Sequence, residues 1–110
     1  MKVSLETRKL AGTVRLALEE RQNLPAVDAA LQGVSAANTE LGTLRKGPKA
    51  PPAWDPVCAR YKEKIDSLIG STRALTATMR DGSNKAVADA ATQWADARNK
   101  AVNAAYSCAS

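Results

Sequence analysis

The second half of the chain carries two helical seams that mirror each other about residue 83. In each, the seam residues recur at alternating steps of three and four, which is typical of one face of a helix packed along a partner. Large residues of the first seam fall opposite small residues of the second if the chain doubles back, so the pattern predicts an antiparallel helical hairpin. The first seam is Cys58, Tyr61, Ile65, Leu68, Thr72, Leu75 and Met79, and the second is Val87, Ala90, Trp94, Ala97, Ala101, Ala104 and Cys108.

The predicted limits of these two helices rest on capping residues. Asp55 offers a side-chain acceptor at the N-cap and Pro56 a suitable φ in the first turn, so we expect the first helix of the hairpin to begin there. Gly82 favours the end of that helix, and Ser83 or Asn84 can cap the next one.

The only two cysteines, Cys58 and Cys108, meet at the open end of the hairpin in this register. We therefore predict a disulfide between them, which closes a loop of about 50 residues and stabilises the fold by up to about 4 kcal/mol. The alternative is a pair of reduced, buried thiols that act as small apolar side chains.

The first half predicts two more helices, at residues 4–22 and about 25–45. Leu5 and Leu16 widen the apolar surface of the first of these. Asn38 lies on the seam of the second, where an Asn usually fixes helix register, although it could also line a binding groove. The inner stripes are Leu10, Val14, Ala17 and Leu18 in the first helix, and Val27, Leu31, Val34, Asn38 and Leu41 in the second.

Residues 46–54 contain three prolines and favour an extended strap. The chain is expected to be one domain, 1–110: an N-terminal helix pair (1–45), the Pro-rich strap (46–54) and the disulfide-pinned hairpin (55–110). The predicted fold is all-α, an antiparallel four-helix bundle. A β-rich fold is disfavoured because Phe is absent and apolar residues do not alternate with polar ones.

No pattern of catalytic residues is present. Histidine is absent, and two cysteines alone do not make a zinc site. The sequence also has no Gly-rich phosphate loop and no nucleophile elbow. We therefore predict no catalytic, cofactor-binding or metal-binding residues, and hence a protein that is not an enzyme.

The net charge of +5 permits contact with anionic partners. Bases and acids interleave along the predicted helices, so the one-sided basic stripe of a nucleic-acid-binding protein is missing. No apolar run approaches 18 residues, and membrane insertion is not expected. The predicted partner is another protein, an acidic one among the candidates, and the chain is expected to be a monomer or a dimer.

The predicted contact residues gather around the strap. Trp54, with Pro51 and Pro52 beside it, can anchor a partner, or Trp54 can instead plug the end of the bundle. The densest basic cluster lies nearby, and Tyr106 falls off the seam of the last helix. The further candidate contacts are therefore Arg45, Lys46, Lys49 and Tyr106.

A disulfide needs an oxidising compartment. We therefore expect a non-enzymatic protein-binding module in the periplasm or outside the cell, such as an immunity protein or inhibitor, an envelope adaptor or a sensor-like domain. The sequence begins without an apolar leader, and a leader removed before this segment would reconcile the two. The alternative is a cytoplasmic structural or assembly protein that packs its helices between chains.

Overall fold

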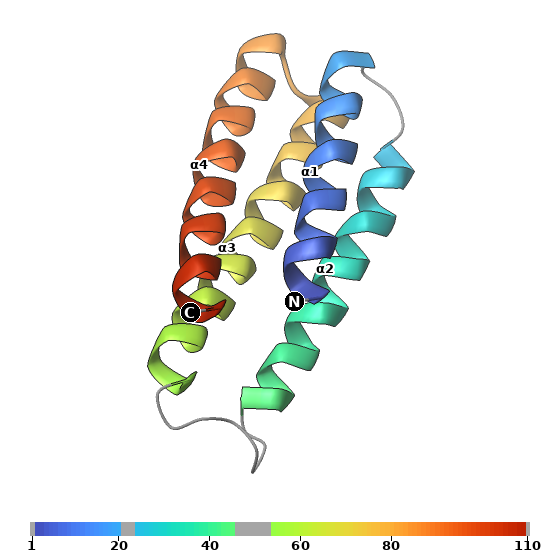
Figure 1. Ribbon diagram of the computed structural model, residues 1–110. Coiled ribbons are helices and arrows are strands. Elements are labelled where there is room, and N and C mark those ends of the chain that lie inside the picture. Colours follow the sequence, from blue (N-terminus) through green and yellow to red (C-terminus); the bar gives the residue numbers. More distant parts are fainter. Residues whose placement is uncertain (1, 21–23, 46–53, 110) are drawn as a thin grey trace.

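The computed structural model describes residues 2–20, 24–45 and 54–109, and the side chains of residues 5–19, 24–40, 56 and 58–105. The described residues form four α-helices, and none of them forms a strand (Figure 1). The helices are α1 (Lys2–Glu20), α2 (Leu24–Arg45), α3 (Trp54–Asp81) and α4 (Asn84–Ala109). The all-helical prediction is confirmed.

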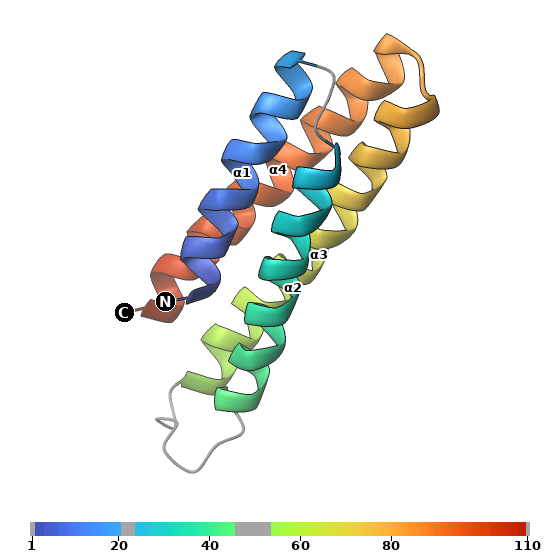
Figure 2. The same cartoon turned by 90° about the vertical axis from the view of Figure 1, so that its right-hand side faces the viewer.

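Each helix packs on the next one along the chain. The most extensive interface joins α3 and α4, and α1 packs on α2 but makes only marginal contact with α4. Figure 2 shows the end of α1, the beginning of α2 and the turn between α3 and α4 at the same end of the molecule. The end of α2 and the beginning of α3 lie together at the opposite end.

The core draws on all four helices, and the seams predicted from the sequence supply most of it. The described seam residues of α3 and α4 are buried, apart from Met79, Ala90 and Ala104, which are half-buried against the core. Asn38 lies among the buried residues of α2. The largest fully buried side chains are Tyr61, Leu10, Ile65, Leu68, Leu75, Val14, Val27, Val34, Thr72 and Cys58.

Two predicted helix boundaries differ from those observed. α1 begins at Lys2, two residues before the predicted start at residue 4. α3 begins at Trp54, one residue earlier than expected, which places Trp54 in the helix rather than in the strap. The earlier start leaves Asp55 and Pro56 inside the first turn. Pro56 is tolerated there because the first N–H groups of a helix have no intrahelical acceptor.

The turn between α3 and α4 depends on two small residues. The Gly82 N–H donates to the Thr78 carbonyl at 2.6 Å, and a Cβ on Gly82 would lie at 2.6 Å from that same oxygen. Only glycine therefore fits without a shift of the backbone. The Ser83 Oγ accepts the N–H of Ala86 at 3.2 Å, so of the two predicted caps for α4, Ser83 is the one that acts.

One hydrogen bond joins the buried faces of α3 and α4. The Trp94 Nε1–H donates to Thr72 Oγ1 at 3.0 Å, and the same hydroxyl donates to the Leu68 carbonyl at 2.7 Å. Thr72 is fully buried and Trp94 is 8% exposed. Seams that mirror each other about residue 83 place Thr72 opposite Trp94, and this hydrogen bond confirms that predicted pairing.

Replacing Thr72 with Val should lower the free energy of unfolding by about 1–3 kcal/mol, because the Trp94 N–H would be left buried without an acceptor while the side-chain volume is kept. Urea denaturation followed by tryptophan fluorescence measures this. Thr92→Val is the matched control, since Thr92 is exposed and its hydroxyl bonds only the Ala88 carbonyl of its own helix. Equal effects of the two changes would contradict the assigned role of Thr72.

Candidate functional site

The contact residues predicted from the sequence fall largely outside the described part of the chain. Lys46, Lys49, Pro51 and Pro52 lie outside the described residues altogether. Arg45, Trp54 and Tyr106 lie in α2, α3 and α4, but their side chains are not among those described. The backbone brings the ends that carry Arg45 and Trp54 to the same end of the molecule (Figure 1). The proposed roles of these residues stay predictions.

A different surface emerges on α1. Leu5 is 52% exposed and Leu16 is 54% exposed, and they are the large apolar side chains of the described residues that face solvent. At about 100° per residue, both lie about half a turn around the helix from Val14, which is buried in the core. The two leucines, which were expected to widen the apolar surface of this helix, form a second apolar surface on its outer side.

Gly12 lies between these two leucines on the same outer side of α1. A Cβ built on Gly12 meets nothing within 4 Å, so packing inside the molecule does not require a glycine here. Leu5, Gly12 and Leu16 therefore form two apolar projections with a notch between them, spread over about 17 Å of helix. We call this set the leucine strip.

Basic residues flank the leucine strip. Arg8 and Arg15 are exposed on one side of it, and Lys9 is exposed on the other. Lys9 pairs with Glu6 at 3.5 Å, and Glu19 is also exposed on this helix. Glu19 follows Arg15 by four residues, so the exposed side chains beside the strip are three bases and one acid.

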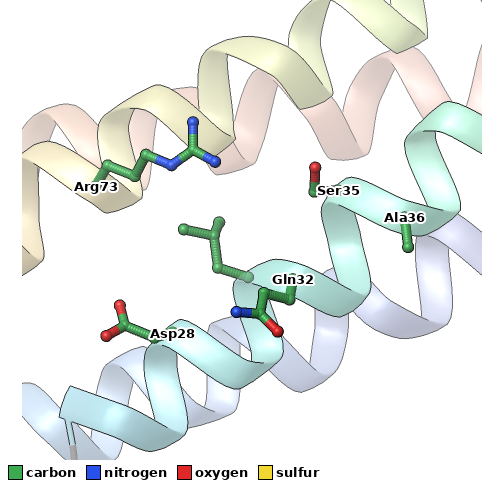
Figure 3. A pocket seen from close by; sticks show the side chains of 6 residues that line it. Asp28, Gln32, Ser35, Ala36 and Arg73 are labelled. Carbon is green, nitrogen blue, oxygen red and sulfur yellow. The ribbon is translucent and has the colours of Figure 1, made fainter.

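An open groove of about 410 Å³ runs between α2 and α3 (Figure 3). The buried Leu31 lines it, and Figure 3 shows Arg73 of α3 on one side of the groove and Asp28, Gln32 and Ser35 of α2 on the other. The Asp28 carboxylate pairs with Arg80 at 3.0 Å, so one of the two charged side chains of the lining already has a partner. The lining residues are Asp28, Leu31, Gln32, Ser35, Ala36 and Arg73.

A second groove of about 430 Å³ lies between α3 and α4 and is lined mainly by polar side chains. Lys100 pairs with Asp96 at 2.9 Å, and the Thr92 hydroxyl bonds its own helix. The lining residues are Lys64, Ser67, Ser71, Thr92, Gln93, Asp96, Ala97 and Lys100.

Asn38 is the one polar side chain by which the α2 seam reaches across to α3 in the described residues. Its Nδ2 donates to Asp66 Oδ1 at 2.7 Å, and Asp66 also pairs with Lys62 at 3.5 Å through its other oxygen. Asn38 is 3% exposed, and its Oδ1 has no hydrogen-bond partner. The contact supports the register-fixing interpretation of Asn38, because it links one point of α2 to one point of α3.

Within the described residues, no group of three or more His, Cys, Asp or Glu side chains is placed to hold a metal ion. None of the helices, as far as they are described, has a long enough apolar stretch to cross a membrane. Comparison of the chain with protein-family models, with curated proteins and with solved structures finds no match.

Changing Asn38 to Asp should lower the free energy of unfolding by about 2–4 kcal/mol at pH 7, because two carboxylates would then face each other at hydrogen-bond distance on a nearly buried side. The penalty should shrink as the pH falls from 7 toward about 4, because burial and the facing carboxylate raise the pKa of one carboxyl of the pair in the folded variant, which then binds a proton before the unfolded chain does.

The double change Asn38→Asp with Asp66→Asn is the matched control. It removes the repulsion between two carboxylates and should recover part of the stability at pH 7, as measured by urea denaturation at pH 7 and pH 4. The remaining loss reflects a carboxylate at position 38, which is 3% exposed and lies 3.5 Å from the Lys62 carbonyl that Asn38 contacts. If the loss of unfolding free energy in Asn38→Asp alone did not change with pH, the side chains at positions 38 and 66 would be apart in solution.

Proposed function

We propose that this chain is a non-enzymatic protein-binding module that acts in the periplasm or outside the cell, as an immunity protein or inhibitor, an envelope adaptor or a sensor-like domain. The observation that carries the binding role is the leucine strip. Two half-exposed leucines lie on the outer face of a helix whose inner face is buried in the core, and we propose that a partner covers them. Such a surface contributes nothing to the fold by itself.

The location outside the cytoplasm rests on the proposed disulfide between Cys58 and Cys108. Cys58 is 1% exposed and lies on the α3 seam. It precedes Thr72 by 14 residues, and Cys108 follows Trp94 by 14 residues. In an antiparallel hairpin whose register is set by the hydrogen bond between Thr72 and Trp94, the two cysteines therefore lie opposite each other. We propose that antiparallel arrangement for the bundle as a whole.

The polar contacts between α2 and α3 support the same arrangement. Arg80, near the end of α3, bonds Asp28, near the beginning of α2, whereas the later Asn38 bonds the earlier Asp66. At these contacts, the residue numbers rise along α2 while they fall along α3, which is the order expected of antiparallel helices. A bundle of two such hairpins, with the second one closed by a disulfide, fits an oxidising compartment.

The second candidate is a cytoplasmic assembly protein that packs its helices between chains. The marginal contact between α1 and α4 favours it, because a helix held mainly by one neighbour can be exchanged with another copy. Light scattering separates the two candidates: a monomer supports the binding module, and a stable oligomer supports the assembly protein.

Replacing Cys58 with Ala should lower the melting temperature more without reductant than with it, because only the oxidised parent gains the loop-closure contribution of about 4 kcal/mol. Thermal unfolding with and without dithiothreitol measures the difference, and intact mass on reduction should rise by two hydrogens in the parent alone. An equal loss of stability in both conditions would leave the buried thiol as a packing residue and remove the argument for export.

Replacing both Leu5 and Leu16 with Ser should abolish capture of the partner from an envelope extract while changing the free energy of unfolding by about 1 kcal/mol or less, because both side chains are half exposed. Affinity capture after chemical cross-linking measures this. The matched control is Ala74→Ser with Ala77→Ser on the exposed side of α3. A captured protein that both variants retain would show that binding occurs elsewhere on the chain.

A further inference from the structure

We propose that the leucine strip binds an acidic amphipathic helix of a partner protein, which lies along α1 with its apolar residues between Leu5 and Leu16. This inference rests on the proposed function, since it assigns the chemistry of the partner to the surface that carries that function. The shape of the strip and the charges beside it suit such a helix better than a second copy of this chain or a membrane surface.

The shape of the strip suits a single helix. Leu5 and Leu16 are 11 residues apart, which is close to three turns, so their side chains project within about 20° of one direction. Gly12 lies within about 20° of Leu5 and adds no side chain, so the gap between the leucines is open. A side chain from an approaching helix fits into this gap as a knob fits into a hole, and the missing Cβ lets the two backbones come close.

The charges beside the strip select an acidic partner. Arg8 and Arg15 are exposed on one side of the strip, with Glu19 beside Arg15, and Lys9 is exposed on the other side, where it pairs with Glu6. Flanking charges of opposite sign stabilise a helix pair and choose its partner, as at the positions beside a coiled-coil seam. Glutamates on both flanks of the incoming helix would meet bases on both flanks of α1.

A second copy of this chain fits less well. In an antiparallel pair related by a two-fold axis, residues on one flank meet the same flank of the other copy, so Arg8 would approach the second copy's Arg15. In a parallel pair, Arg8 would lie beside the second copy's Lys9. Both arrangements bring like charges together, which costs stability.

An anionic membrane surface also fits less well. Helices that lie in a membrane interface bury a broad apolar face. Here the outer face of α1 presents two leucines separated by a glycine, and Lys9 and Glu19 come between or beside them. The strip is therefore narrow, which matches the width of one helix rather than a lipid surface.

The test uses the intact chain and two labelled synthetic helical peptides. Both carry leucines at the same helical spacing as the strip, and they differ only in having Glu or Lys at every flanking position. Fluorescence anisotropy measures the dissociation constant of each. The Glu peptide should bind at least about tenfold more tightly than the Lys peptide, and its affinity should fall severalfold between about 50 and 300 mM salt.

Two charge-reversed variants test whether the charges beside the leucine strip determine which peptide binds more tightly. Arg8→Glu with Arg15→Glu should reverse the preference between the peptides, whereas Arg60→Glu with Arg73→Glu, which changes the net charge equally at exposed positions of α3, should not. Replacing both Leu5 and Leu16 with Ser should raise the dissociation constant of the Glu peptide by about tenfold or more. Equal affinity for the two peptides, or an equal response to both charge reversals, would overturn the inference.

The other occupants are outcomes of the same test. A dimer in sedimentation equilibrium that is lost on changing Leu5 and Leu16 would assign the strip to a second copy. Binding to phosphatidylglycerol vesicles that depends on the same leucines, without binding of the Glu peptide, would assign it to lipid. If the peptides fail while partner capture still needs Leu5 and Leu16, the binding function stands and the acidic helix is wrong; if capture is also independent of the leucines, both proposals fall.

Discussion

The hydrogen bond between Trp94 and Thr72 is the contact on which the arrangement of α3 and α4 depends. Trp94 is the largest side chain of the α4 seam, and its N–H needs an acceptor once it is buried. Thr72 supplies that acceptor at one position only, between the apolar residues Leu68 and Leu75. A shift of one turn toward the beginning of α3 would place the indole N–H against Leu68, whose side chain offers no acceptor. Apolar packing brings the two helices together, and this polar contact selects their offset.

The α3 and α4 helices could be predicted well from the sequence because their seams are long and regular. The residues missed in the core are small or polar ones, such as Thr7, Ala37 and Thr76, which are buried but give no periodic apolar signal. Helix starts were predicted less well, since Asp55 and Pro56 are acceptable both at a cap and within a first turn. Asp66 could not be identified as the partner of Asn38 because their contact depends on how α2 is placed on α3.

The leucines of the candidate binding surface could be identified from the sequence, but the side of α1 on which they lie was not predicted. Leu5 and Leu16 were expected to widen the apolar surface of this helix. The helical phase set by Leu10, Val14 and Ala17 places the two leucines on the opposite side. The predicted contacts around Trp54 are a separate matter, since their side chains lie outside the described residues.

The marginal packing of α1 on α4 has a consequence for how the molecule opens. Because α1 is held mainly by α2, its backbone amides should exchange with solvent through a smaller opening than those of α3, which has neighbours on two sides. A partner seated on the outer face of α1 would add a neighbour to the helix that packs least extensively on the others. Occupancy would then slow exchange most in α1, so that the least protected part of the molecule becomes the part that reports the complex.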